Sequence, residues 1–253
     1  MSSAMFLEQS DRRVLGGFVL SDAITHASVL TPLNVTSKQL KIKVNRSGVY
    51  AIFDAPTFSA PTGQFLSATA SWPVGQSEVT VQDPSLRYLP RRAQVQAPQT
   101  PAVGNPQVTF AGPQSIALYP SPSAGVELNW AAVRATVLGS AGNGLPWAVV
   151  RVLNSTNTAV ATGVTDARGE ALLAVPGLGV QVSAGAGGAV TETTIPVTVE
   201  AWFDPSVLSQ PPGWIPDPDD TLGKLGTAAL KTGQMTGALG AAQVLFAGIT
   251  ITF

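Results

Sequence analysis

A turn followed by a short strand and a proline occurs twice in the chain, and this repeated unit constrains the fold more than any other feature. The first copy is Asn-Arg-Ser-Gly at 45–48, followed by the apolar run 49–53. The second is Asp-Ala-Arg-Gly at 166–169, followed by the run 171–175 and closed by Pro176. Glycine adopts the positive φ that a tight hairpin turn needs, and the run after it is typical of a strand. The repetition predicts two similar β-units in tandem.

Further runs alternate apolar and polar residues or are rich in β-branched residues, as strands with a buried face do. These runs lie at 17–20, 40–44, 78–83, 133–138, 147–153, 195–202 and 244–253. Pro196 cannot donate a ladder hydrogen bond, so the run that contains it is expected at a sheet edge or a bulge. Short strands at this spacing, separated by turn residues, predict an all-β fold of two tandem antiparallel β-sandwich domains.

Proline content divides the chain into parts. Because proline is excluded from central strands and helix interiors, the proline-rich residues 94–125 are expected to form a linker, with one short edge strand at 108–110. The other predicted parts are an N-terminal arm at 1–13, a first sandwich at 14–93, a second at 126–204 and a C-terminal extension at 205–253. The extension is expected to hold a short helix over 221–231, capped by Asp220 or Thr221, and a final strand.

The composition excludes several classes of function. Only 11% of the 253 residues are charged, against about 25% in an average soluble domain. The low fraction favours a surface that lies largely against other protein; the alternative is a cell-surface or low-complexity composition. A net charge of −1 leaves no basic face for nucleic acid. Cysteine is absent, so disulfides and thiolate metal sites are excluded, and the start of the chain does not resemble a signal peptide. The apolar run 238–253 is too short to cross a bilayer, so no membrane insertion is expected.

Side chains that could carry out catalysis are sparse. The one histidine, His26, is expected to be solvated or packed, because a metal cluster or a catalytic triad needs partners that the sequence does not supply. The acidic residues at 217, 219 and 220 fit helix capping, and Asp166 fits its turn. The glycine-rich residues 185–188 fit a hairpin tip. The sequence therefore predicts a protein that is not an enzyme, with no catalytic, cofactor-binding or metal site and no cofactor.

Candidate residues for protein interfaces come from three patterns. Two basic pairs flank the first β-unit, a tryptophan lies among prolines, and the C-terminal strand presents one apolar face. These candidates are Arg12, Arg13, Arg91, Arg92, Trp214, Leu245, Ile249, Ile251 and Phe253. The C-terminal strand can pair within its own sheet or add to the sheet edge of a neighbour. Trp147 and Trp202 are expected in the core.

The repeated unit resembles the transthyretin-like or carboxypeptidase-regulatory-like β-sandwich group, through the residues at 166–169 with Pro176 and those at 46–48 with Pro56. A second resemblance covers most of the chain. The segments 12–19, 46–50, 131–135, 146–149, 167–169 and 216–222 resemble proteins encoded beside the sheath and cap genes of contractile, phage-tail-like injection systems.

The second resemblance implies a structural part of the particle, such as a cap or collar adaptor at the end of the sheath–tube assembly. It further implies a ring of copies, with sixfold symmetry, and contacts with sheath, tube or cap proteins. Such a protein would assemble in the cytoplasm and leave the cell on lysis. The alternatives are a baseplate or virion part, a secreted or surface binding module for carbohydrate or adhesion, and an enzyme.

Overall fold

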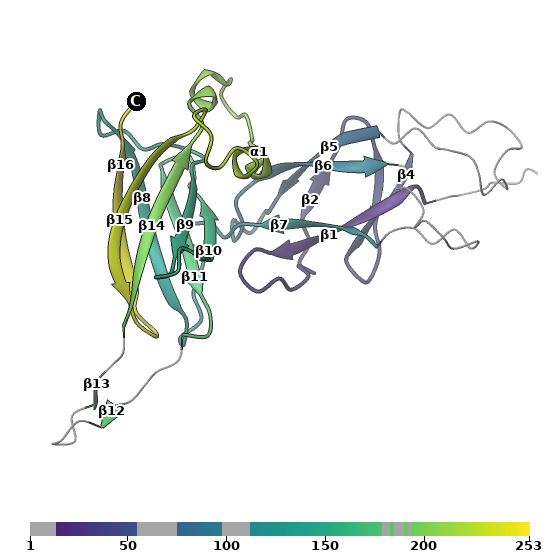
Figure 1. Cartoon of the computed structure of the whole chain (residues 1–253). Helices are drawn as coiled ribbons and strands as arrows, with labels where there is room; N and C mark the ends of the chain where they lie inside the picture. The colour runs from purple at the N-terminus through teal and green to yellow at the C-terminus, as the bar shows by residue number, and fades with distance from the viewer. Residues whose placement is uncertain (1–13, 55–74, 98–111, 179–182, 185–189, 192–193) are drawn as a thin grey trace, which may run out of the picture. The chain divides into compact units, whose positions relative to one another are not determined.

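The computed structural model describes residues 14–54, 75–97, 112–178, 183–184, 190–191 and 194–253, and strands dominate it (Figure 1). The prediction of an all-β fold is therefore confirmed. The strands of the N-terminal half are β1 (Gly16–Asp22), β2 (Asn34–Thr36), β3 (Lys41–Val44), β4 (Val49–Asp54), β5 (Gly75–Gln82), β6 (Arg91–Ala97) and β7 (Gln114–Leu118). They form one sheet in the order β3-β4-β1-β7 and another in the order β2-β5-β6.

Buried residues largely alternate along β1, β4, β5, β6 and β7, as the period of a strand requires, whereas β2 and β3 have no buried residue. On β1 and β4 the buried side chains include Phe18, Leu20 and Ile52, and the ring of Phe18 stacks on that of Tyr50 with centroids 5.2 Å apart. On β5 and β6 they include Val79 and Val95. Each sheet therefore has one apolar, buried face.

The C-terminal half contains β8 (Ala131–Gly139), β9 (Val149–Leu153), β10 (Ala159–Val164), β11 (Glu170–Val175), β14 (Ile195–Phe203), β15 (Lys231–Leu239) and β16 (Val244–Ile251). One sheet has the order β10-β9-β14-β15 and the other has the order β11-β8-β16. A single core receives alternate side chains from both sheets, including Val133, Val150, Val199 and Ile249. These seven strands are therefore a β-sandwich. The short strands β12 (Ser183–Ala184) and β13 (Val190–Thr191) pair with each other.

The chain divides into two compact units, and the division differs from the predicted domain boundaries. The first unit holds residues 1–19, 36–79 and 94–115, and the second holds 20–35, 80–93 and 116–253. The predicted linker, 94–125, includes the end of β6 and all of β7, so these two parts of it belong to sheets rather than to a connector. The edge strand predicted at 108–110 lies outside the described residues, as does the arm at 1–13.

The predicted C-terminal extension is an integral part of the second sandwich. β15 pairs with β14 along its whole length, and β16 pairs with β8 from Val244–Ala132 to Ile251–Gly139. The sequence analysis predicts a purely antiparallel sandwich, but the β8–β16 pairing is parallel. It joins the first and last strands of the domain, which no local turn could reveal.

A turn built on an Asn or Asp side chain recurs along the chain. At Asn45, Asn154 and Asp166, one side-chain oxygen accepts hydrogen bonds from the amides two and four residues later. The residue three positions later has positive φ in each case: Gly48, Asn157 and Gly169. The first two turns close hairpins, β3–β4 and β9–β10.

The turn at 166–169 does not close the hairpin that the sequence predicts. It connects β10 to β11, which lie in different sheets. Its glycine is needed for a second reason, because a Cβ at Gly169 would lie 2.5 Å from the Val137 carbonyl oxygen.

The predicted helix over 221–231 is shorter and begins earlier. After a 3-10 helix, η1 (Pro205–Ser209), the helix α1 spans Pro218–Leu222, and its N-cap is Asp217, whose side chain accepts from the Asp219 amide. Lys231, expected at the end of the helix, instead begins β15.

Pro196 lies in a central strand, where it was expected to mark an edge. β9 pairs with β14 only from Thr198 onward, so the position of Pro196 has β15 on one side and no paired residue of β9 on the other. Pro196 therefore lies where β14 has a paired strand on one side only, the condition under which a sheet tolerates proline. Trp147 and Trp202 lie outside the main core and pack, half-buried, on a smaller cluster around Val149 and Val164.

Candidate interaction surface

The outer face of the sheet β11-β8-β16 combines exposed apolar and charged side chains. Alternate residues of β16 point away from the core, and two of them are apolar: Val244 is 47% exposed and Phe246 is 73% exposed. Arg134 of β8 stands beside Phe246 in the register of the parallel pair. On the other side of β8, Thr136 stands beside Glu170 of β11.

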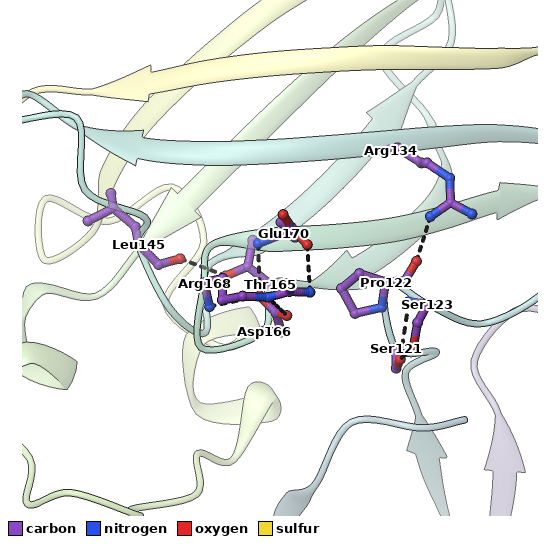
Figure 2. Close-up of polar contacts among 9 residues, drawn as sticks. All are labelled: Ser121, Pro122, Ser123, Arg134, Leu145, Thr165, Asp166, Arg168 and Glu170. Atoms are coloured by element: carbon purple, nitrogen blue, oxygen red, sulfur yellow. Dashed lines mark hydrogen bonds and ion pairs between the residues drawn. The ribbon is translucent and has the colours of Figure 1, made fainter. Parts of the chain in front are cut away.

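A segment before β8 covers one end of this face. Ala124 and Val126 pack on the outward side chains of Ala132 and Leu172, which are 0% and 2% exposed. The side-chain hydroxyls of Ser121 and Ser123, 2.7 Å apart, hold the start of the segment, as Figure 2 shows. The outer face of the sheet is therefore divided into a covered end and an open end.

The open end forms a shallow groove of about 430 Å³, called the outer groove below. Its sides include Pro122, Arg134, Arg168, Glu170 and Phe246. Thr136, Ala247 and Gly248 also line it, and a Cβ built on Gly248 meets nothing within 4 Å. The position at Gly248 therefore has free space above it.

Arg134 is held at the boundary between the covered and the open end. Its Nη1 donates to the Pro122 carbonyl oxygen at 2.5 Å (Figure 2). Within the described ranges, no carboxylate lies within ion-pair distance of Arg134, whereas Arg168 has two carboxylate partners, Asp166 and Glu170. Arg134 is half-buried as a residue, and its positive charge has no carboxylate partner among the described residues.

The turn at 166–169 places the two other charged residues of the groove. Asp166 Oδ1 accepts from the Arg168 and Glu170 amides at 2.8 and 3.0 Å, and the Arg168 Nη2 lies 2.7 Å from Glu170 Oε2. The adjacent Thr165 is fully buried, and its hydroxyl donates to the Leu145 carbonyl oxygen and accepts from the Ala148 amide, both at 2.8 Å. Figure 2 shows the Thr165–Leu145 bond beside the turn.

Three predicted interface residues lie together in a different place, in a cluster that we call the arginine clamp. Arg91 is 1% exposed, and its Nη2 lies 2.9 Å from Asp217 Oδ1 and 2.8 Å from Asp219 Oδ2. Arg92 donates from Nε to the Ile215 carbonyl oxygen, and its guanidinium lies 4.7 Å from the centroid of the Trp214 ring. These residues bind the segment before α1 to β6, within the second compact unit. Arg91 is therefore buried, whereas the sequence analysis expected it at a protein interface.

The predicted residues of the C-terminal strand divide by the direction of their side chains. Ile249 and Ile251 are 1% and 0% exposed and belong to the core, so their prediction as interface residues is wrong. Leu245 packs against the same core. Phe253 is half exposed and its ring lies 5.7 Å from that of Phe203. Arg12 and Arg13 lie outside the described residues.

The sequence analysis misses the residues that do face outward, Val244, Phe246 and Arg134. A signal for Phe246 exists in the sequence, because a large aromatic residue occupies the side of an alternating strand that is normally polar. Arg134 carries no such signal, since its position beside Phe246 depends on the long-range pairing of β8 and β16.

A second pocket, of about 530 Å³, is lined by residues that include Asp22, Arg87, Tyr88 and Trp130. The Tyr88 hydroxyl donates to Asp22 Oδ2 at 2.7 Å. Burial first, and then this hydrogen bond to a carboxylate, raises the pKa of Tyr88 to about 12. Asp22 also accepts from the Ile24 and Thr25 amides, so its oxygens already have partners.

No family model matches the chain, and a search of curated proteins finds no match. Across the described ranges, no group of three or more His, Cys, Asp or Glu side chains is arranged to hold a metal ion. In the same part of the chain, none of the helices combines the length and apolar character needed to cross a membrane.

Proposed function

We propose that this protein is a structural component of a contractile, phage-tail-like injection particle, where it acts as a cap or collar adaptor at the end of the sheath–tube assembly. The resemblance of its segments to proteins encoded with such systems supports the assignment. In this proposal, copies of the chain form a ring and contact sheath, tube or cap proteins.

The observation that carries the proposal is the outward side of β16. Phe246 is 73% exposed and stands next to Arg134, which has no carboxylate partner among the described residues. Aromatic and arginine side chains are the ones most enriched where protein surfaces meet. The low charged fraction, 11%, is the composition expected of a subunit that is surrounded by other protein.

The test is sedimentation of native lysate from cells that make the particle, with the chain followed by mass spectrometry. We expect it in the heavy fraction with sheath and tube. Phe246→Ser should move it to the light fraction, while Leu128→Ser, which removes another exposed apolar side chain, should not. A wild-type chain that stays light while sheath sediments would refute the proposal.

A second candidate function, binding of carbohydrate, is favoured by the pocket that contains Tyr88 and Trp130. Aromatic rings beside polar groups are suited to sugar rings, which have both apolar faces and hydroxyls. A glycan array probed with the purified chain separates the two candidates. Binding that is lost in Trp130→Ala, together with absence from the heavy fraction, would favour the carbohydrate-binding function.

A further inference from the structure

We propose that the outer groove binds an extended peptide segment of a partner subunit, with a carboxylate side chain at Arg134 and an apolar side chain against Phe246. This inference rests on the proposed function, since it names the chemistry of the partner at the same face. Three observations lead to it. Arg134 has no carboxylate partner among the described residues, the space above Gly248 is free, and the outward residues of β16 have the spacing of an extended peptide.

The charges of the groove favour one carboxylate. Two arginines and one glutamate line it, and Glu170 is paired with Arg168 at 2.7 Å. Arg134 bonds to a carbonyl oxygen through Nη1, and no described carboxylate neutralises it. A half-buried guanidinium gains more from a carboxylate than an exposed one does, because less water screens the pair. Glu170 would repel a second or third negative charge, which argues against a polyanion such as nucleic acid.

The shape of the groove favours an extended chain. Phe246 and Gly248 are adjacent outward positions on β16, so about 7 Å separates them along the strand. Alternate side chains of an extended peptide have the same spacing. A peptide lying along β16 can therefore place an apolar side chain at Phe246 while its backbone passes over the open position at Gly248. Arg134 lies on the neighbouring strand, directly beside Phe246.

The same geometry supplies two variants that leave the core untouched. Arg134→Gln removes the charge of a side chain that points out of the sheet. Gly248→Thr adds a β-branched side chain where a Cβ meets nothing within 4 Å, so it fills the groove and suits a strand. Gly248→Thr should unfold at the temperature of the wild type or above it. Arg134→Gln, which loses the bond to the Pro122 carbonyl oxygen, should unfold only a few degrees lower, and a cooperative transition in both variants checks that the sandwich is intact.

The first experiment is a titration of the ¹⁵N-labelled full chain with the peptide acetyl-Glu-Ser-Val-amide, whose Glu and Val side chains share one face of an extended chain, followed by NMR. We expect the amide signals of Thr136, Phe246 and Gly248 to shift. The matched peptide acetyl-Gln-Ser-Val-amide should bind about tenfold more weakly, because it cannot form a charge-assisted pair. Arg134→Gln should remove the difference between the two peptides, and Gly248→Thr should weaken both. Equal binding of the two peptides to the wild type, or shifts confined to other residues, would overturn the inference.

The second experiment repeats the lysate sedimentation with both variants and separates this inference from the proposed function. If the wild type is heavy and both variants are light, the groove is a contact within the particle. If all three are heavy, the groove inference is wrong and the proposed function stands. If the wild type stays in the light fraction but the glutamyl peptide still binds at Arg134, the groove inference stands and only the proposed function is refuted.

Discussion

At the scale of single residues, buried polar side chains hold the loops of this protein in place. Thr165 connects the loop before β9 to the turn before β11 with one hydroxyl. Asp83 does the same for its own loop, since its two oxygens accept from the Ser85, Arg87 and Tyr88 amides at 2.8, 2.9 and 3.0 Å. Such groups are costly to leave without partners once they are buried.

Thr165→Val is expected to lower the free energy of unfolding by about 1–3 kcal/mol. Valine has nearly the same shape, but it leaves the Leu145 carbonyl and the Ala148 amide without their partner in a fully buried position. Urea unfolding monitored by tryptophan fluorescence measures the change. Thr165→Ser keeps the hydroxyl and is the control, which should lose less stability than Thr165→Val. A Thr165→Val protein as stable as the wild type would show that the two hydrogen bonds do not stabilise the fold.

Asp83 should contribute to the loss of stability in acid. Burial tends to raise its pKa, but the hydrogen bonds from Ser85, Tyr88 and Arg87 outweigh burial and hold the pKa below the ordinary value of 3.8. The ionised form is therefore favoured in the folded state, and its contribution is present above pH 3.8 and is lost as the pH falls through the folded pKa.

Asp83→Asn is consequently expected to be less stable than the wild type at pH 7, by about 1–2 kcal/mol, because one of the two acceptor oxygens becomes a donor. The difference should shrink between pH 4 and pH 2 as the wild-type carboxyl takes up its proton. Urea unfolding of both proteins at several pH values measures it. A difference in the free energy of unfolding that stays constant with pH would show that ionisation of Asp83 does not stabilise the fold.

At the scale of elements, the arginine clamp holds the segment before α1 against β6. The Arg92 amide also donates to the Pro216 carbonyl oxygen at 2.8 Å, so backbone and side chains act together. Burial raises the pKa of Asp217, and Arg91 opposes that rise. Asp217 also caps α1, so one carboxylate connects the strand, the connector and the helix.

Arg91→Leu is expected to destabilise the protein by about 3–5 kcal/mol, since it leaves the Asp217 charge buried without its partner. The second variant, Arg91→Leu with Asp217→Asn, should recover a large part of the loss because no uncompensated charge remains. Thermal unfolding of both variants tests this. If the double variant is no better than the single one, the clamp acts through the shape of Arg91 rather than through its charge.

The elements differ in how far the sequence predicts them. β3 alternates strictly, β8 is rich in apolar residues, and the turns that follow them carry Asn or Gly, so the local sequence is enough to predict both strands. β15 escapes prediction because Gly233 and Gly237 weaken its strand signal. The structure explains both glycines: a Cβ would lie 2.6 Å from the Thr250 carbonyl oxygen at Gly233 and 2.9 Å from the Leu245 side chain at Gly237. Because β16 lies so close, these two positions of β15 require glycine, although glycine has a low strand propensity.

The candidate site shows the same limit. The turn that places Arg168 and Glu170 is predictable from four residues. The outer groove is not, since Arg134 and Phe246 become neighbours only when β8 and β16 pair across almost the whole length of the domain. No pattern within a short window of sequence records that pairing.

At the scale of the whole molecule, β16 completes both the core and the outer groove of the second sandwich. Its inward residues Ala247, Ile249 and Ile251 fill the core, and its outward residues form one side of the groove. Stability and the proposed interaction therefore depend on the same strand but on opposite faces of it.

Deleting residues 245–253 is expected to unfold the second sandwich, rather than to leave it folded and unable to assemble. The deletion removes two isoleucines that are almost fully buried and the parallel partner of β8. Loss of each such side chain costs about 2–5 kcal/mol, which together exceeds the margin of a typical domain. Circular dichroism and limited proteolysis measure the outcome, with Phe246→Ser as the variant that keeps the fold. A truncated chain that stays folded and protease-resistant would contradict the structure.

The parallel pairing of β8 and β16 also determines how the second sandwich responds to mechanical force. Because the two strands run in the same direction, tension that enters ahead of β8 and leaves after β16 pulls them past each other. All the hydrogen bonds of the ladder then carry the load together, whereas antiparallel end strands would open one bond at a time. A domain built in this way resists stretching along its chain far better than its equilibrium stability implies.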